Sequence, residues 1–249
     1  MPGDLGPAGE LPQDEGRLGR RFRQFIPRPP HAVAGGLAPW AHLPASERCP
    51  LALGDAVAGL STAVVPASLE PDLRPHAAVL VPLFEREGDT VVVLIRRSLL
   101  LFSNPGDLAF PGGRLEPGER AVDAALREAE EEVALDPALV SVLGRLPIVN
   151  RARGDERVVP YIGVLTAEPA LRSDPSEVDA IFTVALSDLA ADGVYWEEEW
   201  PIPGQDARTL PFFADVAALG NDVIWGMTAM VIRQVLSAAL IRGERSGIA

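Results

Sequence analysis

Three glutamates on one predicted helix are the residues of this chain best suited to chemistry. Glu128, Glu131 and Glu132 are spaced by three and four residues, so on a helix their carboxylates share one face. Crowded carboxylates raise one another's pKa, and a divalent cation offsets that repulsion. Their oxygens suit Mg²⁺ or Mn²⁺, which also accept water and phosphate oxygens as ligands. The spacing therefore predicts a metal site, with a solvated helix face as the alternative.

A glycine-rich approach to this helix favours the metal site. The segment Phe110-Pro111-Gly112-Gly113 precedes the helix, and its two glycines let the backbone turn sharply and come close to a ligand. Glu119 follows Gly113 by six residues, and Arg127 directly precedes Glu128. A tight loop, a fixed glutamate and a carboxylate-bearing helix are much rarer together than separately.

The elements that must position these residues begin with two apolar, β-branched segments joined by a Glu-Gly-Asp turn, a pattern typical of a hairpin. An amphipathic helix follows the glycine-rich loop. The predicted strands are 77–84, 90–97, 139–149, 158–165 and 180–186, and the predicted helices are 120–133 and 223–242. Strands mixed with helices, without an internal repeat, indicate a sheet covered by helices in the α/β or α+β class.

Composition narrows the kind of partner. The chain has 249 residues and a net charge of −13, which argues against nucleic acid and anionic membranes as partners. The lone Cys49 excludes an internal disulfide framework and is compatible with a reducing cytoplasm. Residues 1–11 lack the pattern of a secretory leader, and the apolar stretches 51–69 and 223–241 are interrupted by polar residues or proline. We therefore expect a cytoplasmic protein without a membrane span.

Residues 1–74 differ in character from the rest of the chain. Proline and glycine recur there at short intervals and no periodicity is sustained, so we expect an irregular N-terminal arm. Within it, residues 15–25 could form a short basic helix or a solvated turn. The catalytic domain is expected over residues 75–245.

The motif residues resemble a known family signature. The pattern Gly113-x5-Glu119-x7-Arg127-Glu128-Ala129-x-Glu131-Glu132-x-Ala134-Leu135 is similar to the Nudix box, with Ala134 where the family has glycine. That family hydrolyses nucleoside diphosphates linked to another moiety. The resemblance implies an α/β fold, a Nudix α/β/α sandwich with a mixed sheet flanked by helices.

The resemblance also implies roles for individual residues. Glu128 and Glu132 resemble the principal metal ligands, and Glu131 resembles a further ligand or the base that activates water. Arg127 resembles the residue that orients these carboxylates, and Glu119 an accessory ligand or a structural anchor of the loop. The expected cofactor is Mg²⁺ or Mn²⁺.

A second resemblance concerns the substrate. The segment 93–113, together with 158–163, 177–178 and 224–229, is similar to the coenzyme A pyrophosphatases of this family, although Phe102, Asn104 and Asp107 depart from their pattern. Arg96, Arg97, Gly112 and Gly113 are the expected substrate-binding residues. Further arginines that could compensate for the departures, or be ordinary surface residues, are Arg114, Arg151 and Arg153.

Two aromatic residues and the start of the last helix leave alternatives open. Tyr161 and Phe110 could stack on a base or fill the core of the sheet, whereas core packing is favoured over substrate contact for Trp225 and Met227.

We therefore expect a Nudix pyrophosphohydrolase that splits coenzyme A or its derivatives into 3′,5′-ADP and 4′-phosphopantetheine. One alternative is a Nudix enzyme acting on ADP-ribose, a dinucleotide or a nucleoside triphosphate. A second is a Nudix-fold ligand-binding or regulatory module without catalysis. The expected partner is a small nucleotide-type molecule, and a homodimer is compatible with the sequence.

Overall fold

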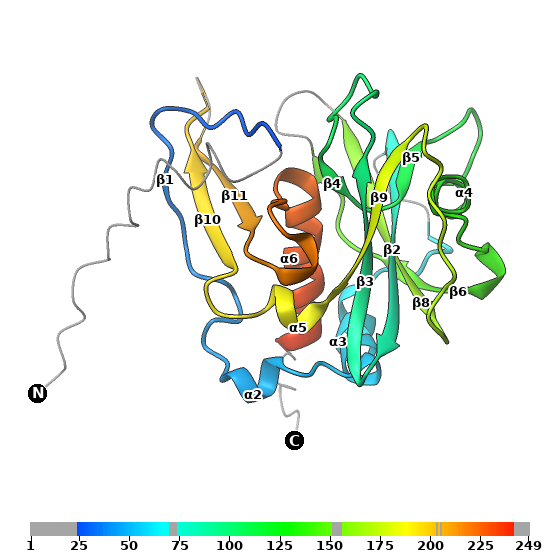
Figure 1. Cartoon of the computed structure of the whole chain (residues 1–249), viewed down its shortest axis with the longest axis horizontal. Helices are drawn as coiled ribbons and strands as arrows, with labels where there is room; N and C mark the ends of the chain where they lie inside the picture. The colour runs from blue at the N-terminus through cyan, green and yellow to red at the C-terminus, as the bar shows by residue number, and fades with distance from the viewer. Residues whose placement is uncertain (1–23, 70–73, 151–155, 203, 205, 242–249) are drawn as a thin grey trace, which may run out of the picture.

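The computed structural model describes residues 24–69, 74–150, 156–202, 204 and 206–241 (Figure 1). The helices are α2 (Ala45–Arg48), α3 (Leu53–Ala63), α4 (Ala121–Val133), α5 (Leu186–Leu189) and α6 (Gly226–Leu240), with 3₁₀ helices at Pro137–Leu139 and Ala217–Leu219. The strands are β1 (Val33–Ala34), β2 (Ala77–Arg86), β3 (Asp89–Arg97), β4 (Leu108–Ala109), β5 (Gly112–Arg114), β6 (Val140–Arg145), β7 (Val149–Asn150), β8 (Arg157–Leu165), β9 (Val178–Ala185), β10 (Tyr195–Trp200) and β11 (Arg208–Phe213).

The main sheet is mixed. Its strands follow the order β4-β3-β2-β8-β6, with β5 added to β2, β7 to β8 and β9 to β3. β2 and β8 run parallel, and the other pairs are antiparallel. Most side chains of β2 and β3 are buried whichever way they point, because helices cover both faces of the sheet.

The two strands of the first hairpin separate beyond its turn. β3 pairs with the end of β2, from Leu83 to Arg86, whereas Ala77 to Val79 at the start of β2 pair with β5. β8 occupies the other edge of β2. β5 must therefore lie on the side of β2 that faces β3, and β4 pairs with the far end of β3. The glycine-rich segment is in this way inserted into the sheet.

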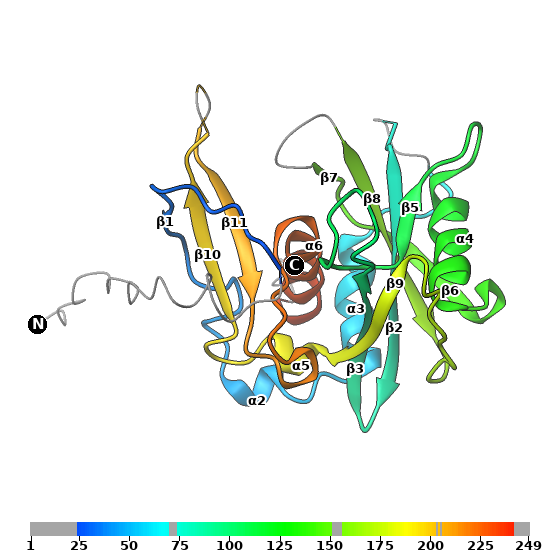
Figure 2. The same ribbon diagram turned by 45° about the horizontal axis from the view of Figure 1, so that its top comes forward.

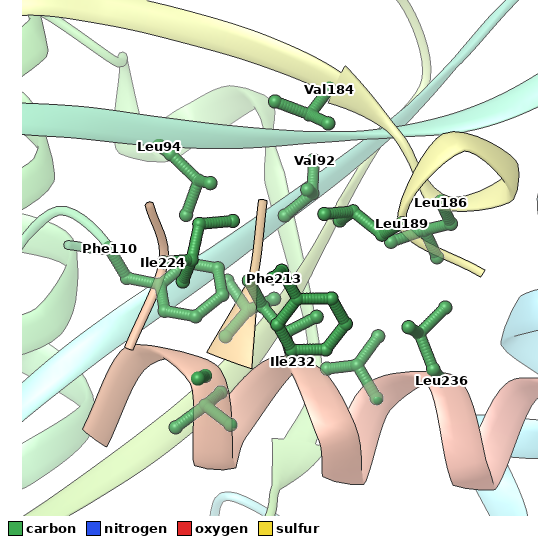
Figure 3. Close-up of a cluster of buried hydrophobic side chains, with 14 of the residues drawn as sticks. Val92, Leu94, Phe110, Val184, Leu186, Leu189, Phe213, Ile224, Ile232 and Leu236 are labelled. Atoms are coloured by element: carbon green, nitrogen blue, oxygen red, sulfur yellow. The ribbon is translucent and has the colours of Figure 1, made fainter. Parts of the chain in front are cut away.

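The molecule has four layers in the order α4, main sheet, the helices α3 and α6, and a second sheet (Figures 1 and 2). α4 packs on one face of the main sheet through a core that includes Ala125, Ala129 and Tyr161. α3 and α6 cover the other face, where Leu94 and Ile232 share a second core (Figure 3). The strands β1, β10 and β11 form a further sheet on the far side of α6. The predicted α/β class, with a mixed sheet flanked by helices, is confirmed.

Each strand and helix predicted after residue 75 is present, with ends shifted by a few residues. The segment predicted as a single strand over 139–149 contains β6 and β7, which are separated by three residues. The predicted loop between β3 and α4 carries the short strands β4 and β5. These strands are too short to produce a periodic pattern.

The sheet of β1, β10 and β11 has no counterpart among the predicted strands. β10 contains the acidic run Glu197 to Glu199, a composition typical of a solvated segment. Glu197 and Glu198 are nevertheless buried. Glu197 pairs with Arg233 at 2.9 Å, and Glu198 accepts hydrogen bonds from Arg28 and Trp200 at 2.8 Å each. Arg28 and Arg233, which are distant in sequence, supply the opposite charges that make this burial tolerable.

The prediction of an irregular arm over residues 1–74 is wrong for much of the part that the structure describes. Trp40, Ala56 and Leu60 are buried in the core shared with α6. Gly59 permits the close approach of α3 to α6, because a Cβ on it would lie 2.3 Å from the Ala238 carbonyl oxygen. Small and apolar residues buried against another helix give α3 little sequence periodicity. Residues 15–23 of the predicted basic helix lie outside the described residues.

The two apolar stretches noted in the sequence form short helices. α3 has 11 residues and α6 has 15. Among the described residues, no helix combines the length and apolar character that crossing a membrane requires.

Candidate active site

α4 carries Glu132 into a buried position beside the glycine-rich segment. Its side chain is 2% exposed, and its Oε2 accepts a hydrogen bond of 2.8 Å from the Gly112 N–H. Burial raises the pKa of Glu132 to about 8, and the charges of Glu128 and Glu177 add to this rise. A buried carboxylate with one backbone donor is a group that a cation would stabilise.

The two glycines are required by close contacts of the backbone. A Cβ on Gly113 would lie 2.4 Å from the carboxylate carbon of Glu128. Gly112 has a φ of +152°, and a Cβ there would lie 2.4 Å from the Ala78 carbonyl oxygen. The absence of side chains thus lets this segment fit between β2 and the carboxylates of α4.

Arg127 binds three glutamates of the predicted motif, namely Glu119, Glu128 and Glu131. Its Nε and Nη2 donate to the two oxygens of Glu119 at 2.9 and 3.1 Å. Its Nη1 donates to Glu128 at 3.0 Å and to Glu131 at 2.9 Å. The bonds to Glu119 and Glu128 raise the pKa of Arg127, and the bonds from Arg127 lower the pKa of Glu119. The paired bonds to Glu119 fix the guanidinium plane and hence the direction of the donor to Glu128.

The carboxylates differ in exposure. Burial is the largest cause that raises the pKa of Glu128, whose side chain is 16% exposed, and Glu131 and Glu177 raise it further. Glu131 is 60% exposed and lies at the rim. Glu177 was not among the predicted site residues, although its charge acts on both Glu128 and Glu132. The only signal for it in the sequence is the second resemblance, which includes Glu177-Val178.

The two predicted substrate-binding arginines of β3 lie on opposite faces of the sheet. Arg97 faces α4, where its Nη1 is 4.0 Å from Glu132 Oε1. Arg96 faces the α6 side, where it pairs with the buried Asp222 and its guanidinium carbon lies 4.9 Å from the centre of the Phe182 ring. The structure therefore brings Arg97, but not Arg96, to the carboxylates. Alternation along a strand accounts for the difference.

The remaining candidate residues of the sequence analysis are aromatic side chains, Met227 and three arginines. Tyr161 and Phe110 are buried in the two cores, and Met227 packs against the core of α6. Trp225 is partly buried. Arg114 is 84% exposed. Arg151 and Arg153 lie outside the described residues.

The donor set fits Mg²⁺ or Mn²⁺. Glu128 and Glu132 offer hard carboxylate oxygens, both with a raised pKa, and Glu177 adds a third negative charge nearby. In the described part of the chain, no group of three or more acidic, histidine or cysteine side chains is placed to hold a metal ion. Three protein ligands are not required, because Mg²⁺ in phosphate chemistry is held by one or two carboxylates, with water and substrate phosphate as its other ligands.

Comparisons with known proteins identify the family of this chain. The NUDIX domain model matches residues 74–202. A Nudix hydrolase NudL of Photorhabdus laumondii is 38% identical over 66% of this chain and 84% of its own length. Nudix hydrolase 3 of Caenorhabditis elegans is 36% identical over 50% of this chain and 56% of its own. A MutT/nudix family protein from Enterococcus faecalis has a TM-score of 0.45 at 18% identity, covering 74% of this chain and 68% of that one. The chain belongs to the Nudix family of pyrophosphohydrolases.

Proposed function

We propose that this Nudix hydrolase is a Mg²⁺- or Mn²⁺-dependent coenzyme A pyrophosphatase. In this proposal Glu128 and Glu132 are the principal metal ligands. Glu131 is a further ligand or the general base, and Glu119 is the accessory residue. The products are 3′,5′-ADP and 4′-phosphopantetheine.

The observation that carries the proposal is the burial of Glu132 beside a backbone amide. The charge of this carboxylate is costly to hold in isolation, as its pKa of about 8 indicates. A group that only stabilised the fold would gain nothing from that cost. A cation and an anionic diphosphate, bound together, would offset it.

The side chains of this chain have distinct tasks in the proposed reaction. Arg127 holds Glu128 and Glu131 in place through Nη1. The Gly112 N–H binds Oε2 of Glu132, so that Oε1, on the side of Arg97, is the oxygen offered to a ligand. Glu131, at the exposed rim, is in a position to accept a proton from water. A bound divalent cation supplies charge neutralisation of the diphosphate and a lowered pKa of its water.

Arg97 is the arginine best placed to contact the diphosphate. It lies 4.0 Å from Glu132 and is 23% exposed, so it is open to a ligand on the carboxylate side. Its planar guanidinium can bind two phosphate oxygens at once. Arg96 is paired with Asp222 on the other face, so we propose no direct substrate contact for it.

The support for coenzyme A over other nucleotides is a resemblance in sequence. The segments that resemble the coenzyme A pyrophosphatases are 93–113, 158–163, 177–178 and 224–229. The test is a substrate panel with Mg²⁺ and, separately, Mn²⁺. It contains coenzyme A, a thioester of coenzyme A, ADP-ribose, a diadenosine polyphosphate and a nucleoside triphosphate, and the products are separated by chromatography.

We expect coenzyme A and its thioester to be cleaved at the highest kcat/KM. Cleavage of ADP-ribose or a dinucleotide, with coenzyme A left intact, would overturn the substrate assignment and leave the enzyme class unchanged. No cleavage of any member, with tight binding of one, would favour a ligand-binding module.

A further inference from the structure

The segment that brings the Gly112 N–H to Glu132 is also held from the side of α6. The Thr228 hydroxyl donates to the Leu108 carbonyl oxygen at 2.9 Å, and the Trp225 indole N–H donates to an oxygen of Asp107 at 3.2 Å. Trp225 directly precedes α6, and Thr228 lies in its first turn. One end of α6 thus contacts two consecutive residues of the segment.

These contacts lie a short distance along the chain from the carboxylates. Leu108 is separated from Gly112 by three residues. One of them, Phe110, is buried in the same core as Ile224 and Ile232 (Figure 3). The Leu80 N–H also donates to the Pro111 carbonyl oxygen at 2.9 Å. A displacement at Leu108 would therefore be transmitted to Gly112 through a packed segment with little freedom.

The same contacts bear on Arg97. Its N–H donates to the Asp107 carbonyl oxygen at 3.0 Å, and its carbonyl accepts from the Gly106 N–H at 3.0 Å. Asp107, bound by the Trp225 indole, is thus hydrogen-bonded through its backbone to Arg97, whose Nη1 lies 4.0 Å from Glu132 Oε1. Both groups that flank Glu132 depend on residues held by α6.

We propose that Thr228 and Trp225 are positioning residues for the hydrolysis. They set the position of residues 107–112, so that the Gly112 N–H meets Glu132 and Arg97 lies beside it. The consequence for catalysis rests on the proposed metal site, whereas the consequence for the loop does not. Neither side chain needs to touch the substrate in this role.

Amide hydrogen exchange tests the effect on the loop directly. In Thr228→Val the hydroxyl is lost at nearly constant volume, and the Leu108 carbonyl loses its donor. Because one such hydrogen bond changes an opening equilibrium by about tenfold, we expect the Gly112 amide to exchange about tenfold faster. Thr228→Ser keeps the donor and should retain the exchange rate of the unmodified protein.

Thr62→Val is the matched control for this experiment. The Thr62 hydroxyl donates to the Gly59 carbonyl oxygen at 2.8 Å within α3, far from the carboxylates in the chain. This variant loses the same kind of bond and should leave the Gly112 exchange rate unchanged. Equal exchange at Gly112 in Thr228→Val and the unmodified protein would overturn the proposal, as would an equal increase in all three variants.

Mn²⁺ titration tests the effect on the site without measuring turnover. We expect Thr228→Val and Trp225→Phe to raise the Kd for Mn²⁺ by about threefold to tenfold, since each removes one hydrogen bond that holds the loop. Trp196→Phe is the matched control for the indole, because its N–H donates to Glu198 in the neighbouring sheet at 3.2 Å. An unchanged Kd in both test variants would contradict the positioning role. If the unmodified protein fails to bind Mn²⁺, the proposed metal site is wrong, and the exchange experiment still decides the effect on the loop.

Discussion

Glu132, the proposed metal ligand, shows at the level of one residue how the burial of an acidic group conflicts with stability. It is nearly inaccessible to water and receives one backbone hydrogen bond, with Arg97 at 4.0 Å. The sequence indicated that Glu128, Glu131 and Glu132 share a face, but helical spacing could not tell the buried Glu132 from the exposed Glu131. That difference depends on Gly112, which approaches α4 only because the hairpin strands separate.

Glu132→Gln should therefore separate stability from activity. We expect it to lower kcat/KM by about 100-fold or more, because a ligand charge contributes several kcal/mol to transition-state stabilisation. In metal-free buffer at pH 9, above the raised pKa of Glu132, the same variant should raise the melting temperature, because a buried charge is removed.

Glu130→Gln is the matched control, since Glu130 lies on the same helix and is exposed. Glu130→Gln should leave both kcat/KM and the melting temperature close to those of the unmodified protein. Activity of Glu132→Gln within a few-fold of the unmodified enzyme would contradict the assignment of Glu132.

The pair of Glu119 and Arg127 predicts a pH dependence of stability. The Arg127 hydrogen bonds lower the pKa of Glu119 in the folded protein below its ordinary value of 4.5. Its contribution is therefore present above pH 4.5 and is lost as the pH falls through the lowered folded pKa. Glu119→Gln should reduce the free energy of unfolding of the metal-free protein at pH 7 by about 1–3 kcal/mol, and by much less at pH 3.

Urea unfolding at the two pH values measures this difference. Glu116→Gln, on the exposed turn nearby, is the control and should show little change at either pH. A loss of stability in Glu119→Gln that is equal at both pH values would exclude the charge of Glu119 as its cause.

Ala134 has a backbone conformation that is unfavourable for alanine, and its departure from the family pattern pointed to this position. It ends α4 with a φ of +54°, in the left-handed region where the family pattern has glycine. Ala134→Gly should raise the free energy of unfolding by about 1 kcal/mol, because glycine adopts this conformation without a steric penalty. Ala138→Gly, in a right-handed 3₁₀ helix, should lower it instead. Chemical unfolding of both variants checks the opposite signs, and a decrease in Ala134→Gly would contradict this explanation.

At the level of elements, the helices and strands with strong local sequence patterns were predicted, whereas those that depend on contacts between distant residues were not. α4 and the long strands of the main sheet have periodic or continuous apolar patterns. β10 does not, because its buried Glu197 and Glu198 are matched by Arg233 and Arg28 from distant parts of the chain. α3 was missed for a related reason, since its packing depends on Gly59, a residue that by itself disfavours a helix.

Gly59 and Gly54 lie on the same helix and should respond oppositely to alanine. Gly59→Ala would place a Cβ 2.3 Å from a backbone oxygen of α6, so we expect a loss of about 1–3 kcal/mol. Gly54→Ala meets no atom within 4 Å and should raise stability by about 0.5–1 kcal/mol. Chemical unfolding of the two variants measures both changes. Equal effects would mean that the packing of α3 on α6 does not depend on Gly59.

At the level of the whole molecule, the fold extends beyond the segment that matches the family. The match covers residues 74–202, whereas Trp40 and Leu60 on one side and Ile232 on the other belong to one buried core. Gln24 binds Asp222, which also pairs with Arg96, so the start of the described chain is tied to the main sheet. The family motif was predictable because it is local in sequence, whereas this core is formed by residues from both ends of the sequence.

The most direct test of the proposed function is the identity of the products that the purified protein releases from coenzyme A in the presence of Mg²⁺. We expect 3′,5′-ADP and 4′-phosphopantetheine in equal amounts, with release lost on chelation of the metal and in Glu132→Gln. Intact coenzyme A under conditions in which ADP-ribose or a dinucleotide is hydrolysed would contradict it.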